Sequence, residues 1–192
     1  MAKVKLIAIA GMPGSGKGTL TDYLQDERQF PVVHFGNMVY EEVQRLGLNN
    51  VKDEKFVRED MRKQDGKEVL AKRAANKADE LLKSGAPIIV LDGLYSWSEY
   101  KYLANKYGDQ LLLLAVTAPR HIRYERALGR DEAHRKYTSA EQIRERDYAE
   151  IENLEKGGPI AFADYTIVND GTPEQLLEKL DSILKNLNLF FN

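Results

Sequence analysis

The sequence predicts an α/β protein of three layers, in which helices cover both faces of a central parallel sheet of five strands. Nearly continuous apolar runs recur along the chain, and such runs are typical of parallel strands buried on both faces. Segments with apolar residues at helical spacing lie between them. A glycine-rich turn separates the first run from the first helical segment. The predicted strands occupy residues 4–10, 31–35, 87–93, 111–117 and 163–171, the last including its turn.

Length and composition limit the class of protein. A chain of 192 residues fits a single domain over 1–192 with small inserts. The net charge of −2 combines many charges of both signs, which predicts no nucleic-acid or anionic-membrane partner. Cysteine is absent, which excludes disulfides and thiolate chemistry and predicts a cytoplasmic protein. No apolar run reaches about 18 residues, so we expect no membrane span.

The glycine-rich turn after the first strand has the spacing of a phosphate-binding loop. Glycine is followed by four residues and then by Gly16-Lys17, and a predicted helix over 17–26 comes next. Glycines allow backbone amides to turn inward around an anion, and the helix adds the positive end of its dipole. Lys17 then places a charge on the β- and γ-phosphates. The predicted nucleotide-binding residues here are Gly11, Pro13, Gly14, Ser15, Gly16, Lys17, Gly18 and Thr19.

One position in this loop departs from the commoner pattern. Gly18 follows the lysine where Ser or Thr usually reaches Mg²⁺, and Thr19 comes one residue later. The string Gly-x-Pro-Gly-x-Gly-Lys-Gly-Thr resembles the loop of adenylate kinases and their relatives. We therefore expect a P-loop NTPase fold that uses ATP with Mg²⁺.

Residues 36–84 are predicted to form a helical, acceptor-binding region that follows the second strand. Asn37 is the expected N-cap of its first helix, and a break at 66–68 divides the later part into two helices. Adenylate kinases carry Gly-Asp-x-x-Arg after the second strand, and the arginine binds the acceptor phosphate. This chain has Gly36 and Tyr40 at the corresponding ends of that pattern. The candidate cations to replace the arginine are Arg58, Arg62 and Arg73, with a solvated helix face as the alternative for Arg58 and Arg62.

The third strand ends in an aspartate. Ligands of open α/β sheets bind at the carboxyl ends of strands, so Asp92 is a candidate to hold Mg²⁺, directly or through water, together with Thr19. The resemblance to adenylate kinases, which have Asp-Gly-x-x-Arg here, implies that Asp92 and Gly93 also border the acceptor. Tyr95 belongs to an aromatic group after this strand and is a candidate to line the acceptor pocket.

The segment after the fourth strand is rich in arginine. Its predicted helix places four of them on one face: Arg120, Arg123, Arg126 and Arg130. Like charges at these spacings repel, so an anion opposite them would relieve the repulsion; the alternative is a solvated helix. Residues 129–139 are polar and predict a mobile lid over the phosphates. Arg126, Arg130 and Arg135 are the predicted catalytic cations that offset charge on the transferred group.

The end of the chain completes the resemblance. Ala163-Asp164-Tyr165-x-Ile167-Val168-Asn169 precedes a helix that Thr172 is predicted to cap. Related folds hold adenine at this turn, which implies nucleotide contacts for Asn169 and Thr172; a plain helix cap is the alternative. The whole pattern resembles the P-loop nucleoside monophosphate kinase superfamily, in an adenylate-kinase-related branch, and its last segment is similar to dephospho-CoA kinases.

Together these features predict an ATP-dependent kinase. The leading interpretation is transfer of the γ-phosphoryl group of ATP to a small phosphorylated acceptor, a nucleoside monophosphate or a molecule that resembles one. The first alternative is a dephospho-CoA kinase-like enzyme, whose hydroxyl acceptor would benefit from a general base. The second is a regulatory ATPase that binds a nucleotide and has no small-molecule acceptor. Phosphoryl transfer needs positioning and charge stabilisation rather than a nucleophile triad.

Overall fold

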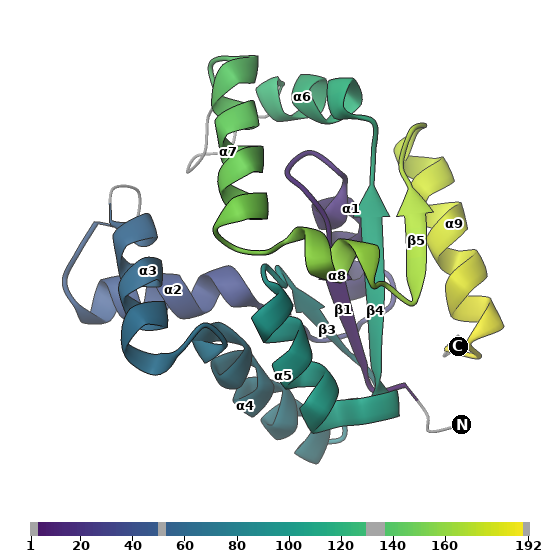
Figure 1. Cartoon of the computed structure of the whole chain (residues 1–192). Coiled ribbons are helices and arrows are strands. Elements are labelled where there is room, and N and C mark those ends of the chain that lie inside the picture. Colours follow the sequence, from purple (N-terminus) through teal and green to yellow (C-terminus); the bar gives the residue numbers. More distant parts are fainter. Residues whose placement is uncertain (1–3, 50–52, 130–136, 190–192) are drawn as a thin grey trace.

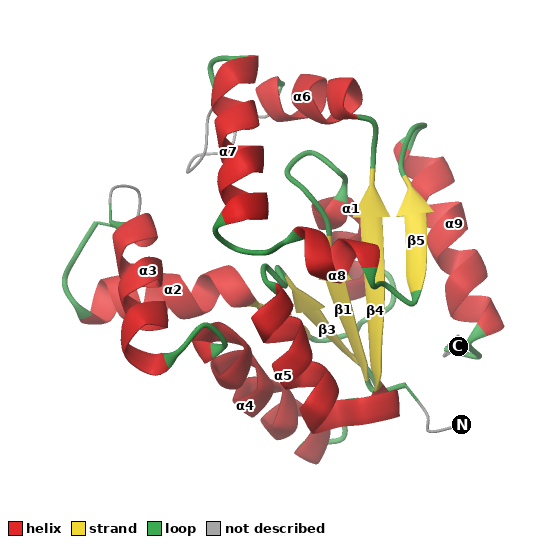
Figure 2. Ribbon diagram, in the orientation of Figure 1, coloured by secondary structure: helices red, strands yellow, loops and turns green. Residues whose placement is uncertain are grey.

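The structure, a computed structural model, describes residues 4–49, 53–129 and 137–189. Its centre is a five-stranded sheet in the order β2-β3-β1-β4-β5, and every neighbouring pair is parallel. The predicted parallel sheet is therefore confirmed (Figure 2). Its strands are β1 (Leu6–Ala10), β2 (Val32–His34), β3 (Ile89–Asp92), β4 (Leu111–Thr117) and β5 (Tyr165–Val168).

Helices cover both faces of this sheet (Figure 1). One face packs against α1 (Lys17–Asp26) and α9 (Pro173–Asn186). The other packs against α2 (Phe35–Arg45), α4 (Val69–Lys83), α5 (Trp97–Tyr107) and α8 (Gly157–Ala161), and α3 (Glu54–Asp65) packs on α2 and α4. A short 3₁₀ turn, Gly108–Gln110, joins α5 to β4. Above the carboxyl ends of the strands lie α6 (Arg120–Leu128) and α7 (Ala140–Glu152).

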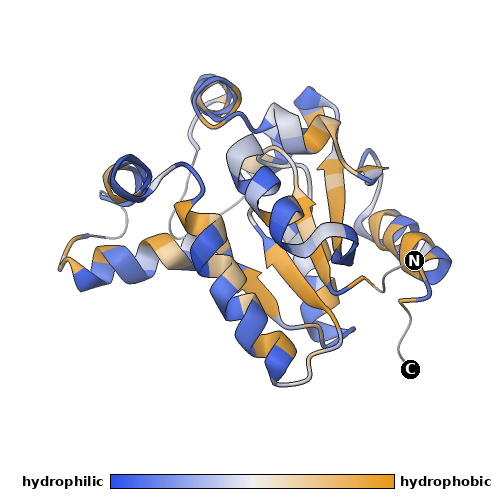
Figure 3. Ribbon diagram, turned by 60° about the horizontal axis from the view of Figure 1, so that its bottom comes forward, coloured by the Kyte–Doolittle hydropathy of each residue, from blue (hydrophilic) through white to orange (hydrophobic). Residues whose placement is uncertain are grey.

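Both faces of the central strand are buried, as its apolar run predicts. Leu6, Ala8 and Ala10 point into the core under α2 to α5, while Ile7 and Ile9 point into the core under α1 and α9. All five side chains are fully buried. Successive strand residues face opposite sides, so a strand between two helical layers must be apolar at every position. Figure 3 shows the same pattern as apolar strands between helices with polar outer faces.

The chain leaves β1 and β3 toward opposite faces of the sheet. Helix α1 follows β1 on one face, whereas the segment after β3 leads to α5 on the other. Neighbouring strands whose connections diverge leave a crevice at their carboxyl ends, where ligands bind in open α/β sheets. The turn at 11–19 and Asp92 lie at this crevice, because Ile9 and Asp92 are direct neighbours in register.

The helical connections agree with the sequence except in two places. The predicted break at 66–68 falls between α3 and α4. Asn37 is not an N-cap, because α2 begins at Phe35 with His34 as its cap and so continues directly from β2. The short helix α8 had no counterpart among the predicted elements. Most of the predicted lid, residues 130–136, lies outside the described residues. Among the helices of the described ranges, none has the length and apolarity to cross a bilayer.

Candidate active site

Two glycines fix the shape of the turn between β1 and α1. Gly14 has a φ of +76°, and a Cβ there would lie 2.3 Å from the carbonyl oxygen of Arg123. Gly16 has a φ of +102°, and its Cβ would lie 2.2 Å from Nδ2 of Asn169. Backbone conformation and close approach therefore both require glycine at these positions. Positive φ angles of this kind let successive amides converge on a phosphate.

The start of α1 adds to this anion site. Gly16 is the N-cap, and α1, which the structure describes in full, has neither a side-chain cap nor an acidic residue in its first turn. The positive end of the helix dipole therefore faces the turn without a carboxylate of the helix's own first turn to neutralise it. Lys17 Nζ lies back across the turn and donates to the carbonyl of Met12 at 3.2 Å. This geometry suits the binding of a polyphosphate.

A pocket of about 260 Å³ opens beside the turn. Five residues of the turn line it, including Lys17 and Gly18. The remaining walls come from segments far apart in the chain, namely Asp92, Tyr95, Ala127, Tyr137, Glu150 and Lys156. The fold thus brings the predicted phosphate lysine and the predicted Mg²⁺ carboxylate to one cavity, together with charged residues that the sequence did not single out.

Asp92 is hydrogen-bonded to a histidine from the neighbouring strand. His34 ends β2 opposite Asp92 in register, and Nδ1 of His34 lies 3.0 Å from Oδ2 of Asp92. The hydrogen bond raises the pKa of His34, although burial opposes this. Burial by itself would raise the pKa of Asp92, but the hydrogen bond from His34 and the charge of Lys17 lower it below its usual value. Asp92 is therefore an ionised acceptor at neutral pH.

The donors at this position fit a magnesium ion bound mainly through phosphates. Within the described ranges no cluster of three His, Cys, Asp or Glu side chains exists that could hold a metal without help. Asp92 is a single carboxylate, and Thr19 lies half-buried in the first turn of α1. Mg²⁺ prefers this situation, since it takes one or two carboxylates and fills its other positions with water and phosphate oxygens. Thr21, one turn further, hydrogen-bonds the carbonyl of Lys17 at 3.1 Å.

Arg123, one arginine of the predicted stripe on α6, has a structural role and is not presented on an open face of the helix. Arg123 is 8% exposed and forms two hydrogen bonds with Asp147 of α7, at 3.1 and 2.6 Å. It also donates to the carbonyl of Pro13 at 3.0 Å. The expectation that the arginines of the predicted stripe face phosphate is therefore wrong for Arg123, because a buried carboxylate already neutralises it. Its contacts instead tie α6 and α7 to the phosphate-binding turn.

Arg126 reaches the turn between β5 and α9. It donates to the carbonyls of Asn169 and Gly171, both at 3.0 Å. Asn169 in turn donates from Nδ2 to the carbonyl of Ser15 at 2.8 Å. Hydrogen bonds therefore link α6, the predicted adenine turn and the phosphate turn. Thr172 caps α9 through a reciprocal capping box. The catalytic role of Arg126 and the nucleotide contacts of Asn169 and Thr172 stay predictions, and Arg130 and Arg135 lie outside the described residues.

The predicted acceptor residues divide into two groups. Tyr95 lines the pocket, and Gly93 before it has a φ of +91° and would bring a Cβ to 3.3 Å from the Tyr95 ring. Gly36 and Tyr40 lie together in α2, where a Cβ on Gly36 would be 3.9 Å from the Tyr40 ring, and neither is among the residues that line the pocket. Of the predicted acceptor residues, Tyr95 after β3 therefore lines this cavity, whereas Gly36 and Tyr40 after β2 do not.

The three candidate acceptor arginines have carboxylate partners within the protein. Arg62 pairs at 2.8 Å with Glu99, which is fully buried. Arg73 pairs at 3.0 Å with Glu42, 12% exposed, whose pKa Arg45 and Arg73 lower to about 2. Arg58 pairs at 2.9 Å with Glu54 of its own helix. The structure brings Arg58 near Tyr95, which contributes to the electrostatic environment of its guanidinium.

The sequence reasoning missed Lys156 and Glu150. Lys156, between α7 and α8, is 2% exposed and pairs with Glu150 at 2.5 Å. Burial raises the pKa of Glu150, but Lys156 and Arg146 outweigh this and lower it to about 2. The hydrogen bond between His34 and Asp92 was also missed. The bond between His34 and Asp92 joins two strands that only the sheet brings together, whereas Glu150 and Lys156 are six positions apart around the end of α7.

Solved structures with similar folds include shikimate kinases. The shikimate kinase from Aquifex aeolicus is 15% identical, with a TM-score of 0.55, and the alignment covers 97% of this chain and 99% of that one. TT1252 from Thermus thermophilus is 22% identical, with a TM-score of 0.61, over 96% and 98% of the two chains. These similarities concern the fold. With the phosphate turn, they place the chain in the kinase-like class of P-loop NTPases.

Sequence comparison narrows this class. The chain belongs to the family described as AAA domain (AAA_18), whose profile matches residues 7–153, and to the UPF0200 proteins. The UPF0200 protein of Thermococcus onnurineus is 33% identical over 95% of this chain and 97% of its own length. The UPF0200/UPF0201 protein of Archaeoglobus fulgidus is 34% identical over 96% of this chain, which spans 56% of that longer protein.

Proposed function

We propose that this protein transfers the γ-phosphoryl group of ATP to a small acceptor that resembles a nucleoside monophosphate. The observation that carries the proposal is the shared pocket of Lys17 and Asp92 at the carboxyl ends of β1 and β3. A lysine in a glycine turn at a helix N-terminus binds polyphosphate, and a nearby ionised carboxylate suits the accompanying Mg²⁺. The kinase-like fold supports a phosphotransferase over other uses of a P-loop.

In the proposed reaction the protein mainly positions reactants and stabilises charge. Lys17 and the amides of residues 11–19 bind the β- and γ-phosphates. Asp92 and Thr19 would hold Mg²⁺, which when bound adds positive charge between those phosphates. The bond from the γ-phosphorus to the β–γ bridging oxygen breaks as a bond to the acceptor oxygen forms, and ADP leaves. Arg130 and Arg135 are proposed to approach from the lid.

One observation favours a second candidate, a hydroxyl acceptor such as that of dephospho-CoA. A hydroxyl must lose its proton on transfer, whereas the phosphate of a nucleoside monophosphate at pH 7 does not require this. Asp92 could take that proton, because it lines the pocket and His34 holds its carboxylate at 3.0 Å. A histidine–carboxylate pair of this kind supports general base catalysis.

An assay of acceptor-dependent ADP formation tests both candidates. The purified protein is incubated with ATP and Mg²⁺ and with AMP, CMP, GMP, UMP or dephospho-CoA in turn. Stimulation by a nucleoside monophosphate supports the first candidate, and stimulation by dephospho-CoA alone supports the second. ADP release at one rate with and without every acceptor would contradict both and favour a regulatory ATPase.

A further inference from the structure

Glu99, the third residue of α5, is a carboxylate that is completely buried. Oε2 of Glu99 accepts hydrogen bonds from the backbone amides of Tyr95 at 2.9 Å and of Ser96 at 3.1 Å. Oε1 of Glu99 accepts a hydrogen bond from Nη2 of Arg62 on α3 at 2.8 Å. One carboxylate therefore joins α3 to the short segment that leads from β3 into α5.

These contacts go beyond what the start of α5 requires. Ser96 and Glu99 form a reciprocal capping box, in which Oγ of Ser96 accepts from the amide of Glu99 at 3.1 Å. Such a box satisfies the amides of a helix start and can do so at the surface of a protein. Here the carboxylate is withdrawn from water and also bonds the amide of Tyr95, the residue before the cap. The additional contacts therefore concern Tyr95 and α3 as well as the helix start.

The segment that Glu99 holds forms part of the pocket wall. Asp92 and Tyr95 both line the pocket, and Gly93 between them has a φ of +91°. Leu94 is 1% exposed and belongs to the core. The register of β3 with β1 fixes Asp92 at one end of the segment, and Glu99 holds Tyr95 at the other. The position of Tyr95 relative to Asp92 therefore depends on the bonds that Glu99 accepts.

Arg62 stabilises the charged form of Glu99. Burial raises the pKa of Glu99, although Arg62 and the two amides oppose this. A buried carboxylate that loses its cation takes up a proton or turns toward water, because its charge is no longer compensated. Either change would weaken the bonds to the amides of Tyr95 and Ser96, since a charged acceptor forms the stronger hydrogen bond. Arg62 therefore acts on Tyr95 through Glu99.

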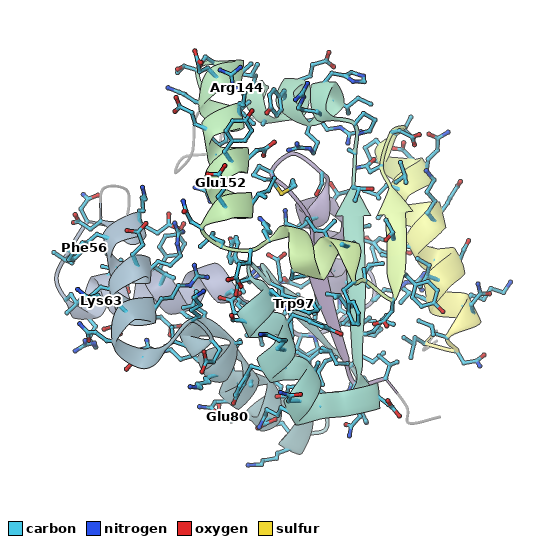
Figure 4. The ribbon with its side chains drawn as sticks, in the orientation of Figure 1. Phe56, Lys63, Glu80, Trp97, Arg144 and Glu152 are labelled. Atoms are coloured by element: carbon cyan, nitrogen blue, oxygen red, sulfur yellow. The ribbon has the colours of Figure 1, made fainter. Side chains whose placement is uncertain are left out.

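This arrangement distinguishes Arg62 from a phosphate ligand. The side chain of Arg62 is 11% exposed and is paired with Glu99, and among the described residues Tyr95 lines the pocket whereas Arg62 does not. An arginine in this place would have to leave Glu99 uncompensated in the core in order to reach a substrate. In Figure 4, Lys63 marks the part of α3 from which the link starts, and Trp97 marks the beginning of α5.

We infer that Arg62 and Glu99 are positioning residues, which fix Tyr95 in the acceptor wall of the pocket and make its position dependent on α3. The word acceptor rests on the proposed function, whereas the link itself rests on the contacts of Glu99. Arg62 then contributes to acceptor recognition without touching the acceptor, and Tyr95 is the residue at the end of the link that touches it. A shift of α3 would be transmitted to Tyr95 by the same bonds.

The position of Tyr95 can be measured without turnover. Protein labelled with 3-fluorotyrosine gives ¹⁹F resonances for its tyrosines, and the resonance that is absent from Tyr95→Phe belongs to Tyr95. We expect this resonance to shift or broaden in Arg62→Met, because Glu99 loses its cation. It should return close to its wild-type position in the double variant Arg62→Met/Glu99→Gln. The glutamine offers an oxygen to the two amides, as in other capping boxes, and leaves no buried charge.

Steady-state kinetics then separate a positioning role from direct binding. The assay uses the acceptor that stimulates ADP formation by wild type. Arg62→Met should raise the KM of this acceptor about tenfold, since small displacements within a site have effects of this size or larger. The KM of ATP should not change, because Lys17 and the phosphate turn are untouched. The double variant Arg62→Met/Glu99→Gln should return the acceptor KM close to that of wild type, whereas a direct ligand could not be replaced in this way.

Arg144→Met is the matched control for the loss of an arginine from an ion pair. Arg144 pairs with Glu141 on its own helix, is 49% exposed, and lies near the start of α7, away from α3 and α5 (Figure 4). The Tyr95 resonance and both KM values should be those of wild type in this variant. Circular dichroism measures whether each variant is folded. If Arg62→Met does not fold, the resonance and the acceptor KM of the double variant decide.

The outcomes separate this inference from the proposed function. A Tyr95 resonance that is unchanged in Arg62→Met, or that does not recover in the double variant, would overturn the link. A recovered resonance with an acceptor KM that stays raised would also overturn it, because Arg62 would then bind the acceptor itself. Recovery of the resonance, together with a wild type that phosphorylates no acceptor, would uphold the link and overturn the kinase.

Discussion

The two sides of the pocket are held together by different physical means. On the donor side, residues 11–19 take their shape from backbone conformation, glycine contacts and the start of α1. On the proposed acceptor side, Arg58 and Lys156 pair with carboxylates four and six positions away in the chain, and Lys156 lies over the ring of Tyr95, which belongs to a distant segment. The backbone geometry of the donor side therefore depends on local sequence, whereas the meeting of Lys156 with Tyr95 depends on how the chain packs. Substitutions on the two sides should therefore have different effects on turnover and on the free energy of unfolding.

Lys17→Ala should give the largest effect, on the donor side. Removal of the cation that faces the γ-phosphate should lower kcat by about 10³-fold, as loss of a preorganised charge stabiliser does. The fold should persist, since Nζ is half-buried at the edge of the pocket and donates to a carbonyl within the same turn. Steady-state ADP formation measures kcat, and circular dichroism measures whether the fold persists. Lys101→Ala, at an exposed position of α5, is the control and should keep wild-type rates. Near-wild-type turnover in Lys17→Ala would contradict the assignment of the donor side.

Arg123→Met tests the link between the phosphate turn and α7. It leaves Asp147, 5% exposed, without its cation, and loss of one partner of a buried pair costs about 3–5 kcal/mol of unfolding free energy. Urea denaturation measures this. The double variant Arg123→Met/Asp147→Leu should recover most of the loss, because no buried charge remains. The exposed Arg144→Met should change stability by less than about 0.5 kcal/mol. Equal effects of Arg123→Met and Arg144→Met would show that the link does not stabilise the fold.

Glu150→Gln tests the acceptor side through pH. The pKa of Glu150 in the folded protein is about 2, below its ordinary 4.5, so its stabilising contribution is full above about pH 5 and is lost as pH falls toward 2. Wild type should be more stable than the variant at pH 7, and the difference should shrink by roughly 3 kcal/mol on acidification to pH 2. Urea denaturation across this range measures the difference. A gap that stays constant with pH would contradict the pairing of Glu150 with Lys156 and Arg146.

Gly14→Ala compared with Gly18→Ala tests the backbone of the donor side. A residue with a side chain at the φ of +76° costs about 1–2 kcal/mol, and the Cβ would also meet the carbonyl of Arg123. Gly18 lies in α1 with nothing within 4 Å of a Cβ, so Ala there should stabilise the helix by about 0.5–1 kcal/mol. Thermal unfolding without ligand should therefore shift in opposite directions. Shifts of the same sign would contradict the described turn.

Local patterns predicted most of the fold. The strand at 111–117 and the helix at 17–26 have the bounds that the sequence indicates, because each combines an unbroken pattern with a clear terminal signal. Asn37 misled the prediction of a helix start, since α2 continues from β2 without the turn that an asparagine cap favours. The helix α8, Gly157–Ala161, contains two glycines and a proline in five residues and has no helical pattern of its own. It is helical because it packs on α5 and β4.

The sequence predicted some residues of the site, and other contacts there could be found only in the structure. Lys17 and Asp92 could be named because each follows an apolar strand, and the carboxyl ends of parallel strands meet at one edge. Arg123 could not be distinguished from a phosphate ligand by spacing alone, since its partner Asp147 lies on another helix. His34 gains its bond to Asp92 only through the register of β2 with β3.

The sequence alone determined the class of fold, the phosphate turn and the likeness to nucleotide kinases. These depend on periodicity, on glycine conformation and on residues adjacent in the chain, which short-range interactions decide. The tertiary structure decided which charges face the pocket and which are neutralised. The Coulomb interaction of Arg58 with Arg146, for example, depends on burial and on the distance between residues 88 positions apart in the chain, and only the packed molecule sets those.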